Sequence, residues 1–226
     1  MRTLAHALSL LLLAALPACA APRQSPPCED PRPLRVALVP VKNTHTQTRQ
    51  YRPLITALEA ATGRRVQAEP AKSYGSVIEG LLAGDIDLAE VGPASYAIAL
   101  KRGAQIDPIA SFTLQPGPAT PSSRAYHSVL ITRHDHPARD LKQLRGGTLS
   151  LTDPASTSGA ILPRQAVQRL TGVPLEAFFE RITFAGAHDR SIEAVRTGRV
   201  DATFVASNAV DDAVRNGVLR MDEIRI

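Results

Sequence analysis

Hydrophobic and polar positions alternate with two different periods from Leu34 onward. Short runs that are mostly aliphatic, such as residues 34–39 and 86–91, are typical of strands buried in a sheet. Residues 53–62 instead place apolar residues three and four apart, as an amphipathic helix does. Strands that alternate with helices of about 8–12 residues predict βαβ units and a mostly parallel sheet.

The same pattern gives bounds for the elements of the first half. Strands are expected at 34–39, 66–68, 86–91 and 126–132, helices at 53–62, 76–83 and 95–102, and a loop rich in Pro and Ser at 115–124. Pro53 is expected in the first turn of its helix, where the missing N–H is tolerated, and Gly63 just beyond its end.

The second half of the chain repeats the first at a fixed offset, with Ile78 falling on Ile192, 114 residues later. The motif Ile78-Glu79-x4-Gly84-x-Ile86-Asp87-x3-Val91 matches Ile192-Glu193-x4-Gly198-x-Val200-Asp201-x3-Val205 without a gap. Such a repeat predicts two supersecondary units built on one plan. We therefore expect two α/β lobes with a cleft between them, the first over 34–126 and the second, with a hinge strand, over 127–226.

The first 33 residues follow neither period. Arg2 precedes an apolar run over residues 4–16, which is shorter than the roughly 20 residues that span a bilayer and therefore predicts a secretory signal over 1–19. Its end has two interpretations: a lipobox in which Cys19 is lipidated, or ordinary cleavage after Ala18-Cys19-Ala20. Residues 20–33 are rich in proline and predict a semi-extended tether.

Composition excludes several classes of function. The formal charge of +5 comes from basic residues that form no run of five or six, and aromatics are only 4%, which disfavours nucleic acid. Two cysteines form neither a disulfide framework nor a four-cysteine zinc site, and His134-Asp135-His136 has no third ligand nearby and is expected to be a solvated turn. There is no P-loop or G-x-G-x-x-G, so no metal or cofactor is expected.

The most informative candidate is Asp153-Pro154-Ala155-Ser156-Thr157-Ser158-Gly159, between a predicted strand and an apolar helical stretch. Hydroxyls at a helix start, with free backbone N–H groups and the helix dipole, suit a small tetrahedral oxyanion. The alternative is an ordinary serine N-cap after an Asp-Pro turn. Pro163 predicts either a bent helix or a tight turn over 156–162 before a helix that starts near Pro163.

The offset of 114 residues also places Tyr74 and His188 at equivalent positions, each before a helix that carries the Ile-Glu pair. Two lobes that face one cleft would then offer a phenol and an imidazole to the same ligand. The alternatives are a Tyr74 that only packs and a His188 in a surface turn. A hydrolase built from Ser158, His188 and Asp201 has no G-x-S-x-G support, and Asp201, like Asp87, is expected to satisfy backbone amides at a sheet edge.

The chain resembles the periplasmic phosphate/phosphite/phosphonate-binding proteins of ABC transporters, from about Leu34 to its last residue. The matching motifs are Tyr74-x3-Ile78-x-Gly80, Gly84-x-Ile86-Asp87-x4-Gly92-Pro93, Tyr126-x-Ser128-Val129-Leu130, Asp153-Pro154-x-Ser156-Thr157-Ser158-Gly159-x3-Pro163 and Gly186-x-His188-Asp189. The resemblance implies a two-lobed binding protein of type II that closes on its ligand like a hinge, without catalysis.

The resemblance also implies a set of ligand contacts and partners. Ser156, Thr157 and Ser158 would wrap the phosphorus-bound oxygens, and Tyr74, Tyr126 and His188 would donate further hydrogen bonds; the last implied ligand residue is Asn208. Members that bind an aminoalkyl phosphonate have an acid at that position, so phosphite, phosphate or an uncharged alkylphosphonate is expected.

The implied partners are an ABC permease and ATPase and, if Cys19 is lipidated, a membrane, with the protein in the periplasm. The alternative is a ligand sensor for a membrane signalling partner. Family members continue beyond Ile226 across a second hinge to the first lobe, so this chain is expected to be truncated at its carboxyl end.

Overall fold

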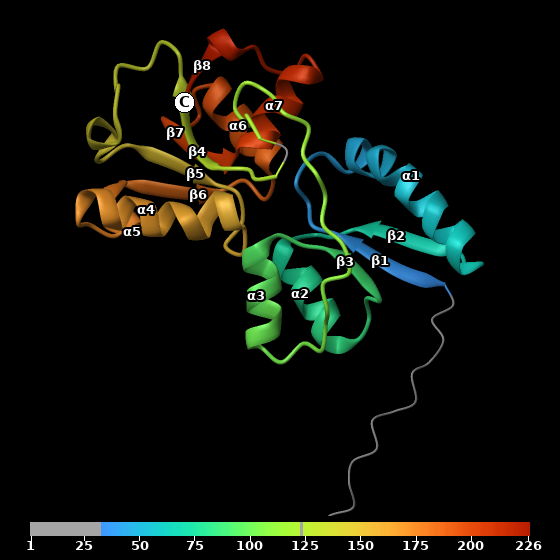
Figure 1. The fold of residues 1–226 in the computed structure, drawn as a ribbon. Coiled ribbons are helices and arrows are strands. Elements are labelled where there is room, and N and C mark those ends of the chain that lie inside the picture. The colour runs from blue at the N-terminus through green and yellow to red at the C-terminus, as the bar shows by residue number, and fades with distance from the viewer. Residues whose placement is uncertain (1–32, 123) are drawn as a thin grey trace, which may run out of the picture. The chain divides into compact units, whose positions relative to one another are not determined.

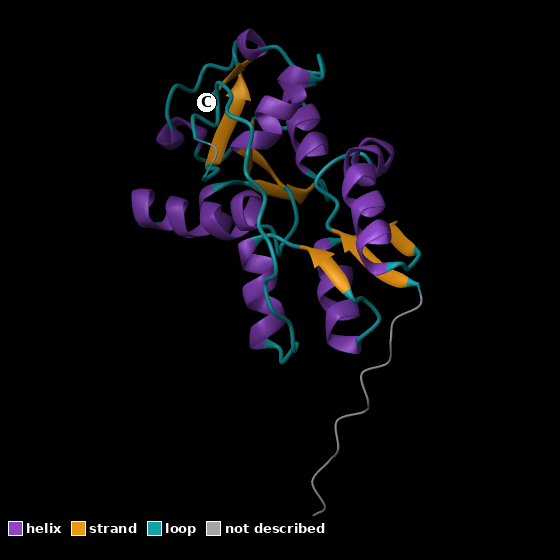
Figure 2. Cartoon of the chain, turned by 45° about the vertical axis from the view of Figure 1, so that its right-hand side comes forward, coloured by secondary structure: helices purple, strands orange, loops and turns teal. Residues whose placement is uncertain are grey.

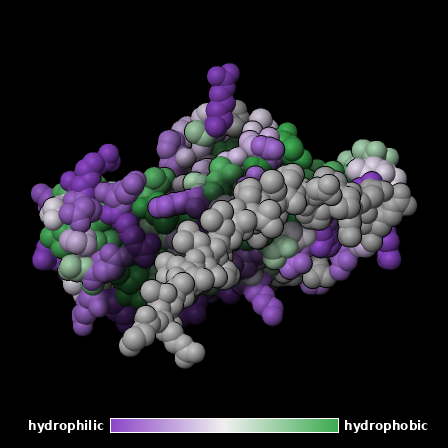
Figure 3. Space-filling view, turned by 90° about the horizontal axis from the view of Figure 1, so that it is seen from below, coloured by the Kyte–Doolittle hydropathy of each residue, from purple (hydrophilic) through white to green (hydrophobic). Residues whose placement is uncertain are grey.

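The computed structural model describes residues 33–122 and 124–226 of the chain. The predicted signal peptide, Cys19 and nearly all of the tether lie outside these residues. Within the described ranges, no helix is long and apolar enough to cross a membrane. On the face seen in Figure 3, hydrophilic side chains are mixed with smaller apolar patches.

The first lobe is a three-stranded parallel sheet in the order β2-β1-β3 (Figure 1). Its elements are β1 (Leu34–Leu38), α1 (Thr44–Thr62), β2 (Val66–Pro70), α2 (Tyr74–Ala83), β3 (Leu88–Glu90) and α3 (Pro93–Lys101). Alternate residues of β1 point to opposite faces, as the strand period of two requires. Val36 and Leu38 pack toward α1, and Ala37 packs toward α2 and α3, so helices cover both faces.

The second lobe is a five-stranded mixed sheet in the order β6-β5-β7-β4-β8. Its strands are β4 (Ser128–Arg133), β5 (Thr148–Leu151), β6 (Arg181–Phe184), β7 (Ala202–Ala206) and β8 (Ile224–Arg225), and its helices are α4 (Leu162–Thr171), α5 (Leu175–Phe178), α6 (His188–Arg196) and α7 (Ser207–Arg215), with 3-10 turns at Leu141–Leu144 and Met221–Glu223. Helices α4 and α5 cover one face of the sheet, and α6 and α7 cover the other (Figures 1 and 2). Val167 and Phe178 pack on the first face, and Ile192 and Val210 pack on the second.

The repeat in the sequence is a repeat in the structure. A shift of 114 residues carries α3 onto α7 residue for residue, and it carries the first residue of α2, Tyr74, onto the first residue of α6, His188. The strand order β2-β1-β3 becomes β6-β5-β7, with the central pairs parallel in both lobes. The prediction of two lobes built on one plan is therefore confirmed.

One bound differs by more than two residues from the sequence prediction. The first helix starts at Thr44 and not near Pro53, because the Asn43 side chain accepts the N–H of His45 and ends the preceding loop. Pro53 lies inside α1 at an exposed position, where water can satisfy the carbonyl that loses its partner. The expected end is correct, since Gly63 follows the helix with a φ of 65°, in the left-handed region.

The hinge strand β4 joins the second sheet antiparallel to β7 and β8. Thr132 pairs with Arg225, so residues 224–225 add the short strand β8 beside β4. The crossover from α3 to β4 carries the predicted loop at 115–124, and its Thr120 hydroxyl donates to the Ser207 hydroxyl over 2.8 Å at the start of α7. The crossover is therefore held against the second lobe before it becomes β4.

Candidate functional site

The predicted site residues meet where the carboxyl ends of the parallel strands of the two sheets face each other, and the two lobes are in direct contact there (Figure 1). The backbone N–H of Ala94, at the start of α3, donates to Thr157 Oγ1 over 2.8 Å. Ser95 Oγ donates to the Ala155 carbonyl over 2.9 Å, and the N–H of Tyr74 donates to Asp153 Oδ2 over 3.3 Å. The first-lobe helix starts are thus joined to the 153–157 loop of the second lobe.

The segment after β5 forms a π-helical turn over Thr157–Ile161 before α4 begins at Leu162. Ile161 N–H reaches back to the Ser156 carbonyl over 3.0 Å, which widens the turn, and Pro163 then falls in the first turn of α4. Of the two predicted arrangements, a separate turn before a helix that starts near Pro163 is therefore present, but the turn is a wide π-helical one and not a tight one.

Ser156 is the N-cap of this turn, with its Oγ accepting the N–H of Gly159 over 3.1 Å. A capping hydroxyl uses a lone pair and keeps its O–H free to donate. The cap interpretation and the oxyanion interpretation are therefore compatible at one side chain. Ser156 and Ser158 are both 2% exposed, and the Ser158 carbonyl accepts the Ser128 hydroxyl over 2.6 Å, which ties the turn to the hinge strand.

Two phenols from outside the turn reach its hydroxyls. Burial raises the pKa of Tyr74, although an interaction with the Ser156 hydroxyl opposes the rise. Burial also raises the pKa of Tyr126, with an opposing interaction from Thr157. Both phenols therefore keep their protons at physiological pH and are able to donate hydrogen bonds.

His188 is buried at the first position of α6, so the alternative of a surface turn is wrong. Its Nδ1 accepts the N–H of Ala206 over 3.3 Å and lies 3.1 Å from Thr152 Oγ1. Because an N–H can only donate, Nδ1 is unprotonated and the ring proton is on Nε2. Burial, with the charge of Lys42, lowers the pKa of His188 to about 4, so the ring is a neutral donor at neutral pH.

Asn208 lies in the first turn of α7, with a buried Oδ1 that has no hydrogen-bond partner among the described residues. A buried amide oxygen without a partner is uncommon in folded proteins. The position is equivalent by the 114-residue shift to Ala94, whose backbone N–H contacts Thr157. The first turns of α3 and α7 therefore both belong to the region where the lobes meet.

Sequence reasoning missed three charged residues in this region. Lys42 Nζ, from the loop after β1, forms an ion pair across the lobes with Asp212 Oδ2 of α7 at 2.6 Å. Asp189 Oδ2 accepts the N–H of Asn43 over 2.6 Å, which is a further contact across the lobes. Glu90, the last residue of β3, has a buried oxygen with no partner among the described residues. The sequence held two signals for these residues. Lys42 lies two residues after the proline that ends the predicted strand, and Glu90 is an acid near the end of an apolar strand.

Other predicted residues lie elsewhere. Asp201 accepts the Thr148 N–H and hydroxyl over 2.7 and 2.8 Å at the start of β7, whereas His188 contacts Ala206 at the other end of that strand. A Ser158-His188-Asp201 triad is therefore not assembled, and the expected role of Asp201 in holding backbone is confirmed. Asp87 likewise accepts the N–H of Arg35 over 2.8 Å.

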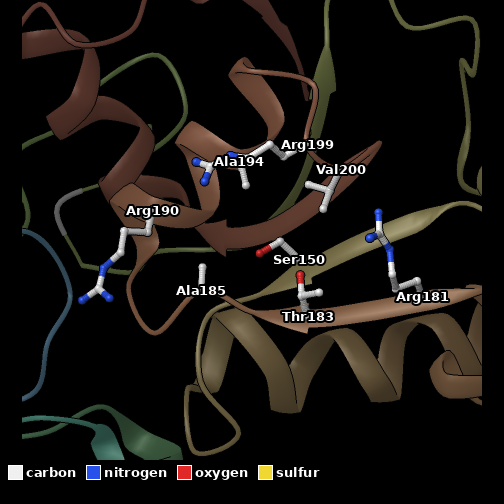
Figure 4. Close-up of a pocket in the computed structure, with 8 residues that line it drawn as sticks. All are labelled: Ser150, Arg181, Thr183, Ala185, Arg190, Ala194, Arg199 and Val200. Atoms are coloured by element: carbon white, nitrogen blue, oxygen red, sulfur yellow. The ribbon is translucent and has the colours of Figure 1, made fainter.

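A separate groove of about 320 Å³ lies beside α6, on the β6 edge of the second sheet (Figure 4). Its lining consists of Ser150, Arg181, Thr183, Ala185, Arg190, Ala194, Arg199 and Val200. The hydroxyls of Ser150 and Thr183 point toward each other at its centre, and the Arg190 side chain extends away from them. None of the predicted site residues lines this groove.

A family model for the periplasmic substrate-binding protein of the phosphonate ABC transporter matches residues 36–226. This chain belongs to that family. A phosphate-import protein, PhnD, of Mycolicibacterium smegmatis is 33% identical over 188 residues, which cover 80% of this chain and 57% of the relative. A phosphonates-binding periplasmic protein of Escherichia coli is 26% identical, covering 88% of this chain and 57% of the relative. This member of the phosphonate-binding family thus spans a little over half the length of these two relatives.

Solved structures show the same fold at low sequence identity. PhnD1 of Prochlorococcus marinus, in complex with methylphosphonate, superposes with a TM-score of 0.70 at 20% identity and covers 86% of this chain and 71% of that one. A binding-protein component of an ABC phosphonate transporter from Pseudomonas aeruginosa gives a TM-score of 0.73 at 20% identity, with 86% and 64% coverage. The predicted class, a two-lobed periplasmic binding protein, is therefore confirmed.

Proposed function

We propose that this chain binds a small phosphorus oxyanion where its two lobes meet, as the solute-binding component of an ABC transporter in the periplasm. The observation that carries the proposal is the set of neutral donors around the 156–158 turn. The hydroxyls of Ser156, Thr157 and Ser158, the phenols of Tyr74 and Tyr126, and the Nε2–H of His188 belong to this set. The three or four phosphorus-bound oxygens of such an anion point in different directions, and uncharged donors from several directions suit them.

Closure of the lobes fits this role. The contacts Thr157–Ala94 and Lys42–Asp212 exist only when the lobes approach each other. An anion that contacts donors from both lobes stabilises the closed form by its differential affinity for that form. Capture by hinge closure is therefore proposed, with delivery to a permease and ATPase, and lipidation at Cys19 is proposed as the means of retention at a membrane.

Calorimetric titration of the purified mature protein tests the ligand class. Phosphate, phosphite, methylphosphonate and 2-aminoethylphosphonate form the panel, with sulfate and chloride as controls. Saturable binding of at least one phosphorus oxyanion is expected, with 2-aminoethylphosphonate not preferred because Asn208 carries no charge. Absence of both heat and thermal shift with all four phosphorus ligands would overturn the proposal.

Ser156→Ala is expected to weaken binding of the preferred anion by about 1.5–3 kcal/mol, or roughly 10- to 150-fold, because the variant loses an O–H that donates to a charged oxygen. The Kd from calorimetry measures the effect. Ser111→Ala is the control, since this serine lies exposed in the crossover. An unchanged Kd in Ser156→Ala, with only a lower melting temperature from the lost cap, would leave Ser156 with the capping role alone.

A further inference from the structure

Glu90 ends β3 at the carboxyl edge of the first sheet, the edge that faces the second lobe. Its backbone is held in the sheet, because its carbonyl accepts the N–H of Val39 over 3.4 Å. Its side-chain Oε2 is buried and has no hydrogen-bond partner among the described residues. A buried carboxyl oxygen in this state is costly unless something else satisfies it.

Four ionisable groups interact electrostatically with Glu90, and they come from different segments of the chain. Lys42 approaches from the loop after β1, Tyr51 from α1, Tyr74 from α2 and Tyr126 from the crossover. Among the described residues Lys42 Nζ forms no ion pair with Glu90; it is bound to Gln50 Oε1 at 2.8 Å and to Asp212 Oδ2 at 2.6 Å. Two of the three phenols whose pKa values Glu90 raises are those that interact with Ser156 and Thr157, and we therefore assign the carboxyl to the wall of the proposed oxyanion site.

Burial raises the pKa of Glu90 to about 7, while Tyr51 and the charge of Lys42 oppose the rise. A carboxyl in this environment carries its proton for a substantial part of the time near neutral pH. A protonated carboxyl has one O–H to donate, whereas an ionised one only accepts. The ordinary ionised state would put a negative charge beside a bound anion, and that is unfavourable.

We propose that Glu90 is a ligand-facing residue of the oxyanion site and that its protonated carboxyl donates a hydrogen bond to an oxygen of the bound anion. The inference rests on the proposed function and deepens it, since it names a further residue of the same site and the form in which it acts. The orphaned Oε2 then receives its partner from the ligand. The proton stays on Glu90, with no transfer required.

Binding is then linked to uptake of a proton. A doubly charged oxyanion close to the carboxyl raises its pKa further, so above pH 7 the free protein must take up a proton before the anion fits. The site therefore favours its ligand at neutral and mildly acid pH. At high pH the affinity falls because Glu90 ionises, in addition to any effect of the ionisation of the ligand itself.

The Glu90→Gln variant isolates this effect, because glutamine keeps an N–H donor of similar shape and never ionises. Affinity for methylphosphonate is measured by calorimetry between pH 6.5 and 8.5 for both proteins, so that titration of the ligand itself cancels in the ratio. Above pH 7, the wild-type affinity is expected to fall relative to Glu90→Gln by up to about tenfold per pH unit. At pH 8, titrations in two buffers of different ionisation enthalpy should show proton uptake by the wild type that the variant lacks.

A second variant separates the effect of a hydrogen-bond donor at position 90 from the effect of a side chain that is merely uncharged. Glu90→Leu has no donor and is expected to bind methylphosphonate about tenfold or more weakly than Glu90→Gln at pH 6.5.

Parallel pH profiles for wild type and Glu90→Gln would overturn the inference while leaving the proposed function in place. Stronger binding of 2-aminoethylphosphonate than methylphosphonate, lost in Glu90→Gln, would also overturn it, because Glu90 would then be the ionised partner of an ammonium. Failure of all variants and the wild type to bind any phosphorus oxyanion would instead overturn the proposed function.

Discussion

Gly159→Ala is expected to cost about 3 kcal/mol or more of unfolding free energy and to abolish most anion binding. A Cβ at this position would overlap the Thr152 side chain and lie 2.9 Å from Ser156 Oγ. Overpacking of this kind in a rigid core typically costs about 1–3 kcal/mol, and here both neighbours are fully buried. Because Thr152 Oγ1 contacts His188 Nδ1 at 3.1 Å, its displacement also moves the imidazole.

Thermal unfolding and titration with the preferred oxyanion measure the two effects, and a fall in melting temperature of about 6–12 °C corresponds to this loss. Gly75→Ala is the matched control. Its Cβ would meet only Ser73 Oγ at 3.6 Å in the first turn of α2, an ordinary contact. We expect that variant to be neutral or to stabilise by up to about 1 kcal/mol. Equal stability of the two variants would contradict the close packing of Thr152 on Gly159.

Lys42→Met is expected to weaken anion binding by about 2 kcal/mol, or roughly 30-fold. Lys42 and Asp212 form the ion pair across the lobes, with side chains 17% and 28% exposed. Loss of the lysine leaves Asp212 near the anion without this partner. It also removes a positive charge near His188, in the region where the anion is proposed to bind. Both changes disfavour the closed, anion-bound form.

The control is Arg220→Met, which breaks an ion pair with Asp222 whose side chains are 75% and 67% exposed. Exposed pairs contribute little, so the Kd should not change. In a double-mutant cycle, Lys42→Met and Asp212→Asn should together cost less than the sum of the single effects. Strict additivity would show that the two residues act separately and that their pair does not stabilise closure.

The internal repeat is the reason that so much of the fold could be predicted. A single shift of 114 residues fixed the equivalence of Tyr74 and His188, and the two residues start equivalent helices in the structure. The start of α1 was missed because Pro53 is a strong local signal for a helix start, whereas the Asn43 cap that ends the loop depends on one side-chain contact. Local patterns therefore found the elements and missed one boundary.

The charged residues of the site could not be predicted from the sequence, for a different reason. Glu90 lies in an apolar strand pattern, and nothing nearby in the sequence shows that its oxygen is buried where two lobes meet. Lys42 and Asp212 are 170 residues apart, and their pairing depends on lobe closure. The hydroxyl cluster at 156–158 was found because it is contiguous. The positions of Glu90 and Lys42 around this cluster depend on tertiary packing.

The central claim is that a phosphorus oxyanion is bound between the lobes at the 156–158 turn and His188. NMR of protein labelled with ¹⁵N-histidine, titrated with methylphosphonate, tests it most directly, with the His188 signal assigned by its loss in His188→Gln. The free protein should show a neutral ring with its proton on Nε2 down to about pH 4. On saturation, the Nε2–H signal should shift and exchange more slowly with water while the tautomer stays the same. Saturable methylphosphonate binding that leaves the His188 signals unchanged would contradict this placement of the site.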